Sequence, residues 1–227
     1  MSTWEELGVW WLEEVADPSY RELVDPLLEA LLTGGRADGV VADLGSGNGR
    51  LMRRAEQLTG ARVIGVELVE ALARKSDRPV VVSRLPSIPF ADMSLDGAYS
   101  VLVLEHIEDD REFFAETARV VRPGGFLIVI ANHPIWTAPG STPISDTDGE
   151  VLWRPGQYFD RGGSVEPAGT GEVLFFHRSM SELLNAASRA GWDLDVLIEK
   201  SNEKAEQGPE VPRLAGFRWR RRPFPEG

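Results

Sequence analysis

The feature that most constrains the fold is a repeated alternation of short apolar runs with helix-like stretches between residues 40 and 131. The apolar runs have the length and β-branched content of buried strands and lie at 40–42, 62–67, 80–83, 96–102 and 126–131. Helices are expected between them at 48–58, at 70–76 and, from the capping-box pair Asp109 and Glu112, up to Val121. Strands joined by crossover helices form a parallel, doubly wound sheet.

The N-terminal part is expected to add two or three short helices. Apolar positions up to Leu32 recur at helical spacing, and Asp17 and Asp25 each stand before a proline that suits a first helical turn. Gly34 and Gly35 then end the helical pattern before the first strand.

The C-terminal part completes the sheet. Ser179 and Glu182 have capping-box spacing for a helix that Gly191 ends. Residues 192–198 and 214–219 fit an antiparallel hairpin at the sheet edge. The sequence therefore predicts an α/β protein with a doubly wound, Rossmann-like sheet of seven strands, mainly parallel, whose last strand is antiparallel.

Residues 133–178 differ in composition from the rest of the chain. They are rich in Pro, Gly, Ser and Thr with scattered aromatic residues, which is typical of an insertion between a strand and a helix. Its segments 150–153 and 172–176 are expected to pair as a hairpin. We expect the whole chain to form a single domain.

Composition and charge exclude several classes of partner. The 24 Lys and Arg against 36 Asp and Glu give a net charge of −12, the wrong sign for broad contact with nucleic acid. With no Cys, disulfides and thiolate chemistry are excluded. The N-terminus lacks a secretion signal and no apolar run approaches ~20 residues, so we expect a cytoplasmic protein without membrane contact.

The glycine-rich segment 41–49, Val-Ala-Asp-Leu-Gly-Ser-Gly-Asn-Gly, leads from the first strand of the sheet into a helix. Its glycines permit a tight turn and let a ligand lie against the backbone, which predicts a nucleotide-like cofactor. A dinucleotide fits poorly, because its fingerprint needs glycine where Arg50 stands and its pyrophosphate disfavours a carboxylate as close as Asp43. A glycine-rich turn that binds no ligand is the alternative.

Two carboxylates near this turn suit S-adenosylmethionine instead. Asp43 can attract the cationic amino group of its methionyl part, and this cofactor has no phosphate for the loop to bind. Glu67 ends the second strand about 20 residues after the loop, where a carboxylate can accept hydrogen bonds from both ribose hydroxyls. These residues favour S-adenosylmethionine as the cofactor.

At these residues the chain resembles the class I S-adenosylmethionine-dependent methyltransferases, and among them the small-molecule branch related to ubiquinone-biosynthesis enzymes. The resemblance covers residues 40–131. It rests on Asp43 and the glycine-rich loop, Glu67, Ile88-Pro89-Phe90 before Leu95-Asp96, and the segment 119–125, Arg-Val-Val-Arg-Pro-Gly-Gly, before the fifth strand.

The resemblance also implies which residues bind the cofactor. They are Asp43, Gly45, Ser46, Gly47, Asn48, Glu67, Leu68, Arg84, Leu85, Ser100 and Val101. One departure concerns the adenine: many relatives carry Gly-Asp where this chain has Ser83-Arg84, so the usual carboxylate contact to the adenine amino group is missing. The Leu85 backbone and apolar packing are expected to hold the adenine, and Arg84 either joins them or points to solvent.

Histidines are the candidates for proton removal. Methyl transfer is an in-line displacement in which positioning contributes much of the rate, so a base is optional. Where the acceptor must lose a proton, His106 and His133 are the catalytic candidates because they follow the fourth and fifth strands, beyond which ligands of open α/β sheets bind. His177 also flanks the expected site, and the alternative for each histidine is capping or packing.

Aromatic residues in the N-terminal helices are candidate lid residues. In similar enzymes this segment folds over the cofactor cleft, and Tyr20 is the residue that we expect to contact the acceptor. Trp10 and Trp11 lie on the same segment, where packing of an amphipathic helix is the alternative.

The insertion is expected to form the wall of the acceptor site, because it leaves the fifth strand at the cleft and carries many aromatics. Its expected substrate-contacting residues are Trp136, Trp153, Tyr158 and His177. A dimer contact or a small separate core is the alternative for these aromatics.

Together these parts predict one methyltransferase domain over residues 1–227. Its parts are a helical lid at 1–36, a cofactor-binding core at 37–132, the insertion at 133–178, and a C-terminal helix and strands at 179–227. The expected activity is methyl transfer to a small-molecule acceptor, with no metal ion. A protein or RNA methyltransferase, which predicts a basic groove or an added domain, and a non-catalytic cofactor-binding module are the alternatives.

Overall fold

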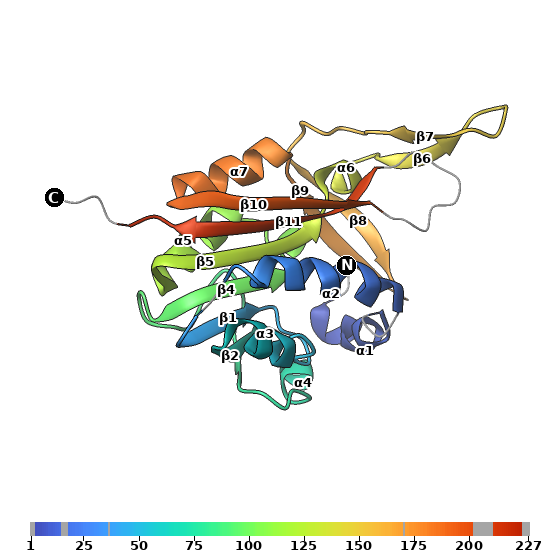
Figure 1. The fold of residues 1–227 in the computed structure, drawn as a ribbon. Coiled ribbons are helices and arrows are strands. Elements are labelled where there is room, and N and C mark those ends of the chain that lie inside the picture. The colour runs from blue at the N-terminus through green and yellow to red at the C-terminus, as the bar shows by residue number, and fades with distance from the viewer. Residues whose placement is uncertain (1–2, 15–17, 36, 170, 202–210, 224–227) are drawn as a thin grey trace.

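A computed structural model describes residues 3–14, 18–35, 37–169, 171–201 and 211–223. In these residues a central sheet carries helices on both faces, and two hairpins extend from one end of it (Figure 1). The expected helix cap Asp17 lies outside the described residues. Among the helices described here, none combines the length and the apolar character needed to span a membrane.

The sheet has seven strands in the order β10-β11-β5-β4-β1-β2-β3. Their bounds are β1 Val40–Leu44, β2 Arg62–Glu67, β3 Val80–Val82, β4 Leu95–Val101, β5 Val121–Asn132, β10 Trp192–Ser201 and β11 Pro212–Arg221. Neighbouring strands from β3 to β5 are parallel, whereas β11 runs antiparallel to both β5 and β10. The predicted doubly wound, mainly parallel sheet with an antiparallel last strand is confirmed.

Two helices begin where the sequence places capping boxes. The helix bounds are α1 Trp4–Glu14, α2 Pro18–Leu32, α3 Met52–Thr59, α4 Glu70–Ala73, the 3₁₀ turn η1 Leu104–His106, α5 Asp110–Val120, α6 Pro134–Thr137 and α7 Met180–Arg189. Asp109 accepts hydrogen bonds from the N–H groups of Arg111 and Glu112, and Ser179 and Glu182 form the predicted capping box. These side chains satisfy first-turn N–H groups that have no partner inside the helix.

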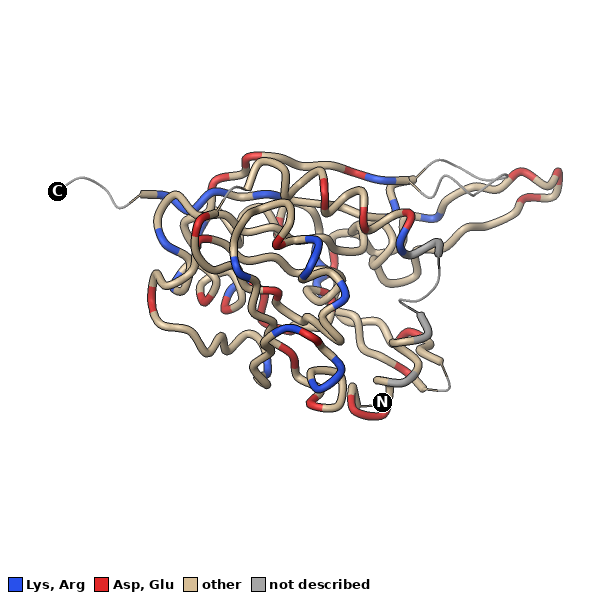
Figure 2. The backbone as a smooth tube through the Cα atoms, turned by 60° about the horizontal axis from the view of Figure 1, so that its bottom comes forward, with Lys and Arg blue, Asp and Glu red and all other residues tan. Residues whose placement is uncertain are grey.

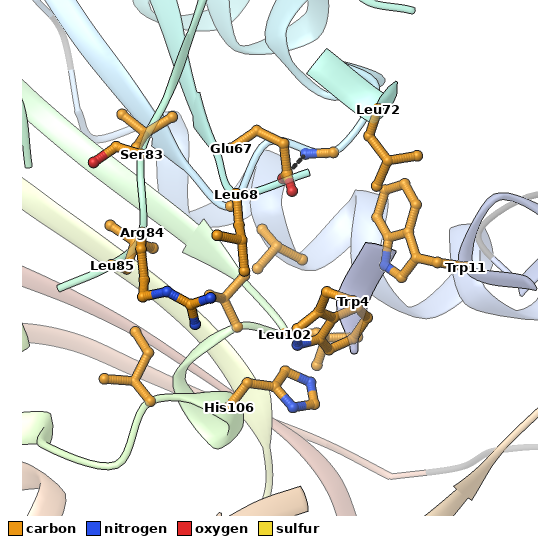
Figure 3. A pocket seen from close by; sticks show the side chains of 16 residues that line it. Trp4, Trp11, Glu67, Leu68, Leu72, Ser83, Arg84, Leu85, Leu102 and His106 are labelled. Carbon is orange, nitrogen blue, oxygen red and sulfur yellow. Dashed lines mark hydrogen bonds between the residues drawn. The ribbon is translucent and has the colours of Figure 1, made fainter. Parts of the chain in front are cut away.

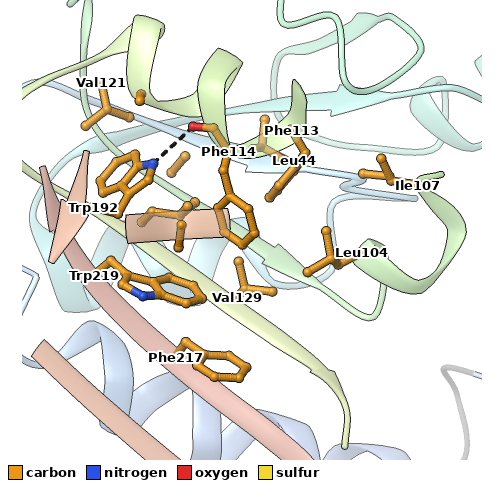
Figure 4. Packing of buried hydrophobic residues seen from close by; sticks show 14 of the residues in the cluster. Leu44, Leu104, Ile107, Phe113, Phe114, Val121, Val129, Trp192, Phe217 and Trp219 are labelled. Atoms are coloured by element: carbon orange, nitrogen blue, oxygen red, sulfur yellow. Dashed lines mark hydrogen bonds between the residues drawn. The ribbon is translucent and has the colours of Figure 1, made fainter. Parts of the chain in front are cut away.

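Large aromatic side chains join β11 to α5 on one face of the sheet (Figure 4). Phe217 and Trp219 stack with ring centroids 4.8 Å apart, and Phe114 meets Trp219 edge to face. The indole N–H of Trp192 donates to the carbonyl of Phe114 at 3.1 Å, so this buried donor is satisfied. The C-terminal hairpin is therefore fixed to α5 by packing and by a hydrogen bond.

On the opposite face, α2 packs against the sheet, and one prediction about this helix is wrong. Leu27 and Leu31 are fully buried there. The sequence predicts a helix start at Asp25-Pro26, but Pro26 lies inside α2. Burial of the apolar face outweighs the backbone hydrogen bond that proline cannot donate. Asp25 caps no helix and instead pairs with Arg50 at 2.8 Å.

The insertion forms two separate hairpins, so the predicted pairing of 150–153 with 172–176 is wrong. The pairs are β6 (Thr142–Ser145) with β7 (Val151–Arg154), and β8 (Gly162–Ala168) with β9 (Gly171–His177). Each strand pairs with its neighbour in sequence because a short connection loses the least loop entropy. The β6–β7 hairpin projects beyond the sheet (Figure 1), whereas β8–β9 packs on α1.

Trp219→Ala is expected to lower the free energy of unfolding by about 3–5 kcal/mol, because it removes a large side chain that is only 1% exposed. Chemical denaturation followed by circular dichroism measures this loss. Leu197→Ala on the neighbouring β10 is the control, since Leu197 is 37% exposed and its truncation should change stability by only about 0.5 kcal/mol. Equal losses in the two variants would contradict this assignment of the core.

Candidate functional site

A pocket opens at the carboxyl ends of β1, β2 and β4, where ligands of open α/β sheets bind (Figure 3). It contains about 750 Å³ of empty space, the open mouth included. Its lining consists of Trp4, Trp11, Gly45, Gly47, Val66, Glu67, Leu68, Leu72, Ser83, Arg84, Leu85, Val101, Leu102, Val103, His106 and Ile107.

The glycine-rich turn forms one wall of this pocket with its backbone. Gly45 and Gly47 adopt φ angles of 83° and 56°, in the left-handed region that favours glycine. A Cβ on Gly45 would lie 2.4 Å from the side chain of Val103, and one on Gly47 would lie 2.1 Å from the ring of Trp11. Both the conformation and the close approach therefore require glycine.

Glu67, at the end of β2, is hydrogen-bonded to the glycine-rich turn. Its Oε2 accepts the N–H of Gly47 at 2.7 Å, and its Oε1 accepts the N–H of Val69 at 2.8 Å. Burial raises the pKa of the Glu67 carboxyl, and these backbone hydrogen bonds oppose the rise. Each oxygen keeps a further lone pair, so the carboxylate can still accept hydrogen bonds from hydroxyl groups in the pocket.

Asp43, near the end of β1, borders a smaller adjoining hollow. Its side chain is buried, and its Oδ2 accepts a hydrogen bond from the hydroxyl of Tyr99 at 2.8 Å. Burial raises the pKa of Asp43 to about 7; the Tyr99 hydroxyl opposes this rise, the charge of Glu67 adds to it, and Arg50 opposes it. A cationic ligand group beside a buried carboxyl with a raised pKa would stabilise its ionised form.

Trp11 stands between the two hollows. It lines both of them, as do Gly45 and Val101. A ligand that reaches from Glu67 to Asp43 must therefore displace the Trp11 ring or pack against it.

The helix α1 supplies two tryptophans to the pocket. Trp4 and Trp11 both project from α1 toward it (Figure 3). Of the tryptophans predicted as lid candidates, Trp11 lines the pocket, whereas Trp10 packs with α1 against β8–β9. The side chain of Tyr20, the predicted lid residue, lies outside the described part of the structure.

Most of the predicted cofactor residues gather around these hollows. Gly45, Gly47, Glu67, Leu68, Arg84, Leu85 and Val101 line the pocket, and Asp43 and Ser46 line the adjoining hollow. Asn48 and Ser100 line neither: the Asn48 side chain accepts the N–H of Arg50 at 3.3 Å, and the Ser100 hydroxyl donates to the Leu44 carbonyl at 3.0 Å. These two residues shape the turn and the strand rather than the cavity.

Arg84 lies at the mouth of the pocket. Its side chain is exposed, yet it lines the cavity, and its guanidinium extends over the cavity (Figure 3). Within the residues that the structure describes, no hydrogen bond or ion pair engages this guanidinium. Arg84 is therefore available to a bound ligand.

His106, at the end of η1, faces the pocket (Figure 3). Its Nδ1 lies 3.3 Å from the carbonyl oxygen of Leu174, and because a carbonyl only accepts, Nδ1 carries the proton. The rings of Trp4 and Phe175 flank the imidazole at centroid distances of 4.7 and 4.9 Å. Burial lowers the pKa of His106 despite the opposing charge of Glu105, so the ring is neutral near pH 7 with an unprotonated Nε2.

His133 does not line the pocket. Its Nδ1 accepts the N–H of Ile135 at 3.1 Å, and its Nε2 donates to Glu199 at 2.7 Å. The ring therefore caps the short helix α6 with both nitrogens engaged, which is the alternative that the sequence left open. Among the described residues, no group of three or more His, Asp or Glu could hold a metal ion.

The four residues of the predicted substrate wall also lie away from the pocket lining. His177 is 1% exposed; its Nδ1 accepts from the Thr137 hydroxyl at 2.9 Å and its Nε2 donates to the Tyr158 carbonyl at 2.8 Å. Trp136 and Trp153 pack against each other with ring centroids 4.5 Å apart. These contacts hold the insertion together, so the structure does not bring the four side chains to the pocket.

Several pocket residues were not predicted from the sequence. They are Trp4, Val66, Leu72, Ser83, Leu102, Val103 and Ile107. Leu102, Val103 and Ile107 follow β4, so the rule that ligands bind beyond strand ends was the available signal for them. Apolar side chains carry no reactive group that distinguishes lining from core.

Comparison with known proteins agrees with this geometry. Residues 42–129 match the sequence model of the methyltransferase domain family. The chain is 28% identical over 113 residues to the O-methyltransferase cnsE of Penicillium expansum, covering 44% of this chain and 41% of that protein. It is 33% identical over 97 residues to 24-methylenesterol C-methyltransferase 2 of Oryza sativa, covering 38% and 27%. The aligned part thus spans less than half the length of these curated relatives.

The fold is also that of a solved methyltransferase. The crystal structure of an S-adenosylmethionine-dependent methyltransferase from Mesorhizobium loti matches with a TM-score of 0.73 at 23% identity, covering 87% of this chain and 96% of that one. The structural likeness covers 87% of this chain, whereas the match to the family model is confined to residues 42–129. Residues 42–129 therefore match the methyltransferase domain family, and the fold is that of a solved S-adenosylmethionine-dependent methyltransferase.

Proposed function

We propose that this protein transfers a methyl group from S-adenosylmethionine to a small-molecule acceptor in the pocket beside the glycine-rich turn. The observation that carries the proposal is the pair of buried carboxylates, Asp43 and Glu67, that border the two adjoining hollows at this turn. A ligand with a cationic amine at one end and a sugar diol in its middle satisfies both carboxylates at once.

The residues present fit this cofactor. Asp43 would bind its amino group and Glu67 its ribose hydroxyls, while the Leu85 backbone and Arg84 would border the adenine. The cofactor supplies a methyl group on a sulfonium, which is already activated for transfer to a nucleophile. The chain therefore has to bind the cofactor and the acceptor, orient them and exclude water. Trp11 and the apolar lining would exclude water.

His106 is the residue that we assign to proton removal when the acceptor is a hydroxyl or a protonated amine. It lines the pocket, it is neutral near pH 7, and within the described residues no hydrogen bond engages its Nε2. His133 and His177 have both ring nitrogens engaged, so neither is proposed as a base.

The charge distribution favours a small-molecule acceptor over a nucleic acid, which would require a large basic groove. Positions of Lys and Arg are interspersed with positions of Asp and Glu along the backbone (Figure 2), and the net charge is −12. The names of the relatives include O- and C-methyltransferases, so the attacked atom is left open in this proposal. The ubiquinone-related branch and the cytoplasmic location stay predictions from the sequence.

Asp43→Ala and Glu67→Ala are each expected to weaken S-adenosylhomocysteine binding about ten- to a hundred-fold. Each change removes one charged hydrogen-bond partner, a loss that typically costs ~1.5–3 kcal/mol. Isothermal titration calorimetry measures the dissociation constants.

Asp148→Ala is the matched control for this experiment, because Asp148 is an exposed carboxylate in the turn of the β6–β7 hairpin. Its affinity should equal that of the unchanged protein. Unchanged affinity in both site variants would overturn the cofactor assignment. Normal affinity without methyl transfer to any acceptor in a broad panel of small molecules would favour the non-catalytic module.

Lowering the pH should weaken cofactor binding while it stabilises the free protein. The raised pKa of Asp43, about 7, means that most molecules carry a protonated carboxyl at pH 5.5, whereas a cationic amine needs the ionised form. We therefore expect affinity to fall on the order of 20-fold between pH 7.5 and pH 5.5. Calorimetry at the two pH values tests this.

The sign for stability is opposite, because the folded state binds the Asp43 proton more tightly than the unfolded state. Between pH 4 and pH 7, this group stabilises the free protein more as the pH falls. Asp43→Asn removes a titrating carboxyl of nearly the same size, so both pH effects should shrink in this variant. An unchanged pH dependence in Asp43→Asn would show that another group is responsible.

A further inference from the structure

Arg178, the residue after β9, is a buried cation that the proposed reaction does not use. It is 4% exposed. Its Nη1 donates to the carbonyls of Leu104 at 3.1 Å and Phe176 at 3.2 Å, and its Nη2 donates to the carbonyls of Glu108 at 2.8 Å and Ile107. One guanidinium thus joins the end of β9 to three carbonyls of the segment 104–108.

That segment carries His106 and has few hydrogen bonds of its own. The 3₁₀ turn η1 covers only Leu104–His106, and its internal bonds include Ile107 N–H to Leu104 carbonyl at 3.2 Å. A single short turn is marginal without tertiary support. The planar guanidinium of Arg178 supplies that support with several N–H donors in a fixed geometry, which a lysine ammonium could not reproduce.

A buried arginine is costly, so its retention requires compensation. Asp110 is 1% exposed, its carboxylate lies 3.4 Å from Nε of Arg178, and it also pairs with Arg161. The charge of Arg178 is thereby balanced while its Nη groups stay directed to the carbonyls of segment 104–108. Removing Arg178 would take the guanidinium donors away from the carbonyls of Ile107 and Glu108 and leave the Leu104 carbonyl with the Ile107 N–H alone.

The same strand also determines the protonation of the His106 ring. Leu174 on β9 presents its carbonyl to Nδ1, so Nδ1 is protonated and Nε2 is not. The other histidines have the opposite arrangement, because Nδ1 of His133 accepts from the Ile135 N–H and Nε2 of His177 donates to the Tyr158 carbonyl. His106 is therefore expected to be the one Nδ1–H tautomer among the three histidines of the chain.

We propose that Arg178 is a positioning residue: by holding the carbonyls of segment 104–108 it keeps the His106 imidazole against the Leu174 carbonyl, with unprotonated Nε2 directed to the pocket. The value of this arrangement for methyl transfer rests on the proposed function. The arrangement itself does not, and the experiment separates the two.

The tautomers can be read from the imidazole ¹⁵N shifts of the full-length protein at about pH 8, where neutral rings predominate. With three histidines in the chain, His106→Gln, His133→Gln and His177→Gln assign the signals. In the unchanged protein we expect His106 as Nδ1–H and the other two as Nε2–H. In Arg178→Lys, the ratio of Nδ1–H to Nε2–H at His106 should fall about tenfold, as when one hydrogen bond no longer selects the tautomer.

Arg161→Lys is the matched control. Arg161 also pairs with Asp110, but its side chain is 40% exposed and it makes no contact with the carbonyls of segment 104–108 among its described hydrogen bonds. The His106 tautomer should not change in this variant. If Arg178 only stabilises the fold, Arg178→Lys will lower the melting temperature and leave the His106 tautomer unchanged, and this result would overturn the proposal. An Nε2–H tautomer of His106 in the unchanged protein would also overturn it.

A second measurement decides the matter if Arg178→Lys does not fold. In the unchanged protein, the Arg178 guanidinium protons should exchange slowly with solvent and show nuclear Overhauser contacts to residues 107 and 108. Rapid exchange without such contacts would overturn the proposal. Calorimetry with S-adenosylhomocysteine on the same sample tests the proposed function separately, so absent binding with an intact tautomer pattern contradicts only the cofactor assignment.

Discussion

The hydrogen bond from the Gly47 N–H to the Glu67 carboxylate is the contact on which the site depends. Because β1 and β2 are parallel neighbours, the turn after one strand and the last residue of the other meet at the same edge of the sheet. Glu67 also accepts the Val69 N–H, so one carboxylate fixes both the glycine-rich turn and the corner that leads to α4. Both hollows of the pocket are built around this turn.

That geometry has an electrostatic consequence. Two carboxylates are buried close enough for the charge of Glu67 to raise the pKa of Asp43, and the Tyr99 hydroxyl compensates only in part. The free protein therefore stores an unfavourable interaction that a cationic ligand relieves. The two buried carboxylates therefore lower the stability of the free protein at the site where a cationic ligand would bind, as is common for binding sites.

Local sequence patterns predicted the strands of the sheet and two of the helix starts. The apolar runs located the strands of the sheet, and capping residues such as Asp109 and Ser179 located two helix starts. Asp43 and Glu67 were predictable because strand ends in a parallel sheet converge. The predicted site residues that do not line the pocket are Asn48, Ser100, His133 and the wall residues of the insertion, and their placement depends on side-chain direction and on the partners of ring nitrogens.

Tertiary packing explains the other differences between the sequence predictions and the structure. Pro26 continues a helix because Leu27 and Leu31, which follow it, are buried against the sheet, and no local rule weighs that burial. Trp4 and Leu102 were missed for a related reason: an apolar residue has the same sequence signal whether it lines a pocket or fills a core.

The insertion contacts the pocket through β9, by the Leu174 carbonyl and the Phe175 ring, rather than through the aromatic residues predicted for the substrate wall. Strand β9 offers the Leu174 carbonyl and the Phe175 ring to His106, and the same hairpin packs on α1 through Ala168 and Val173. Helix α1 carries both Trp4, packed on the His106 ring, and Trp11, packed on the glycine-rich turn. The glycine-rich turn and the His106 imidazole, on two walls of the pocket, therefore share one support, which consists of α1 and the β8–β9 hairpin.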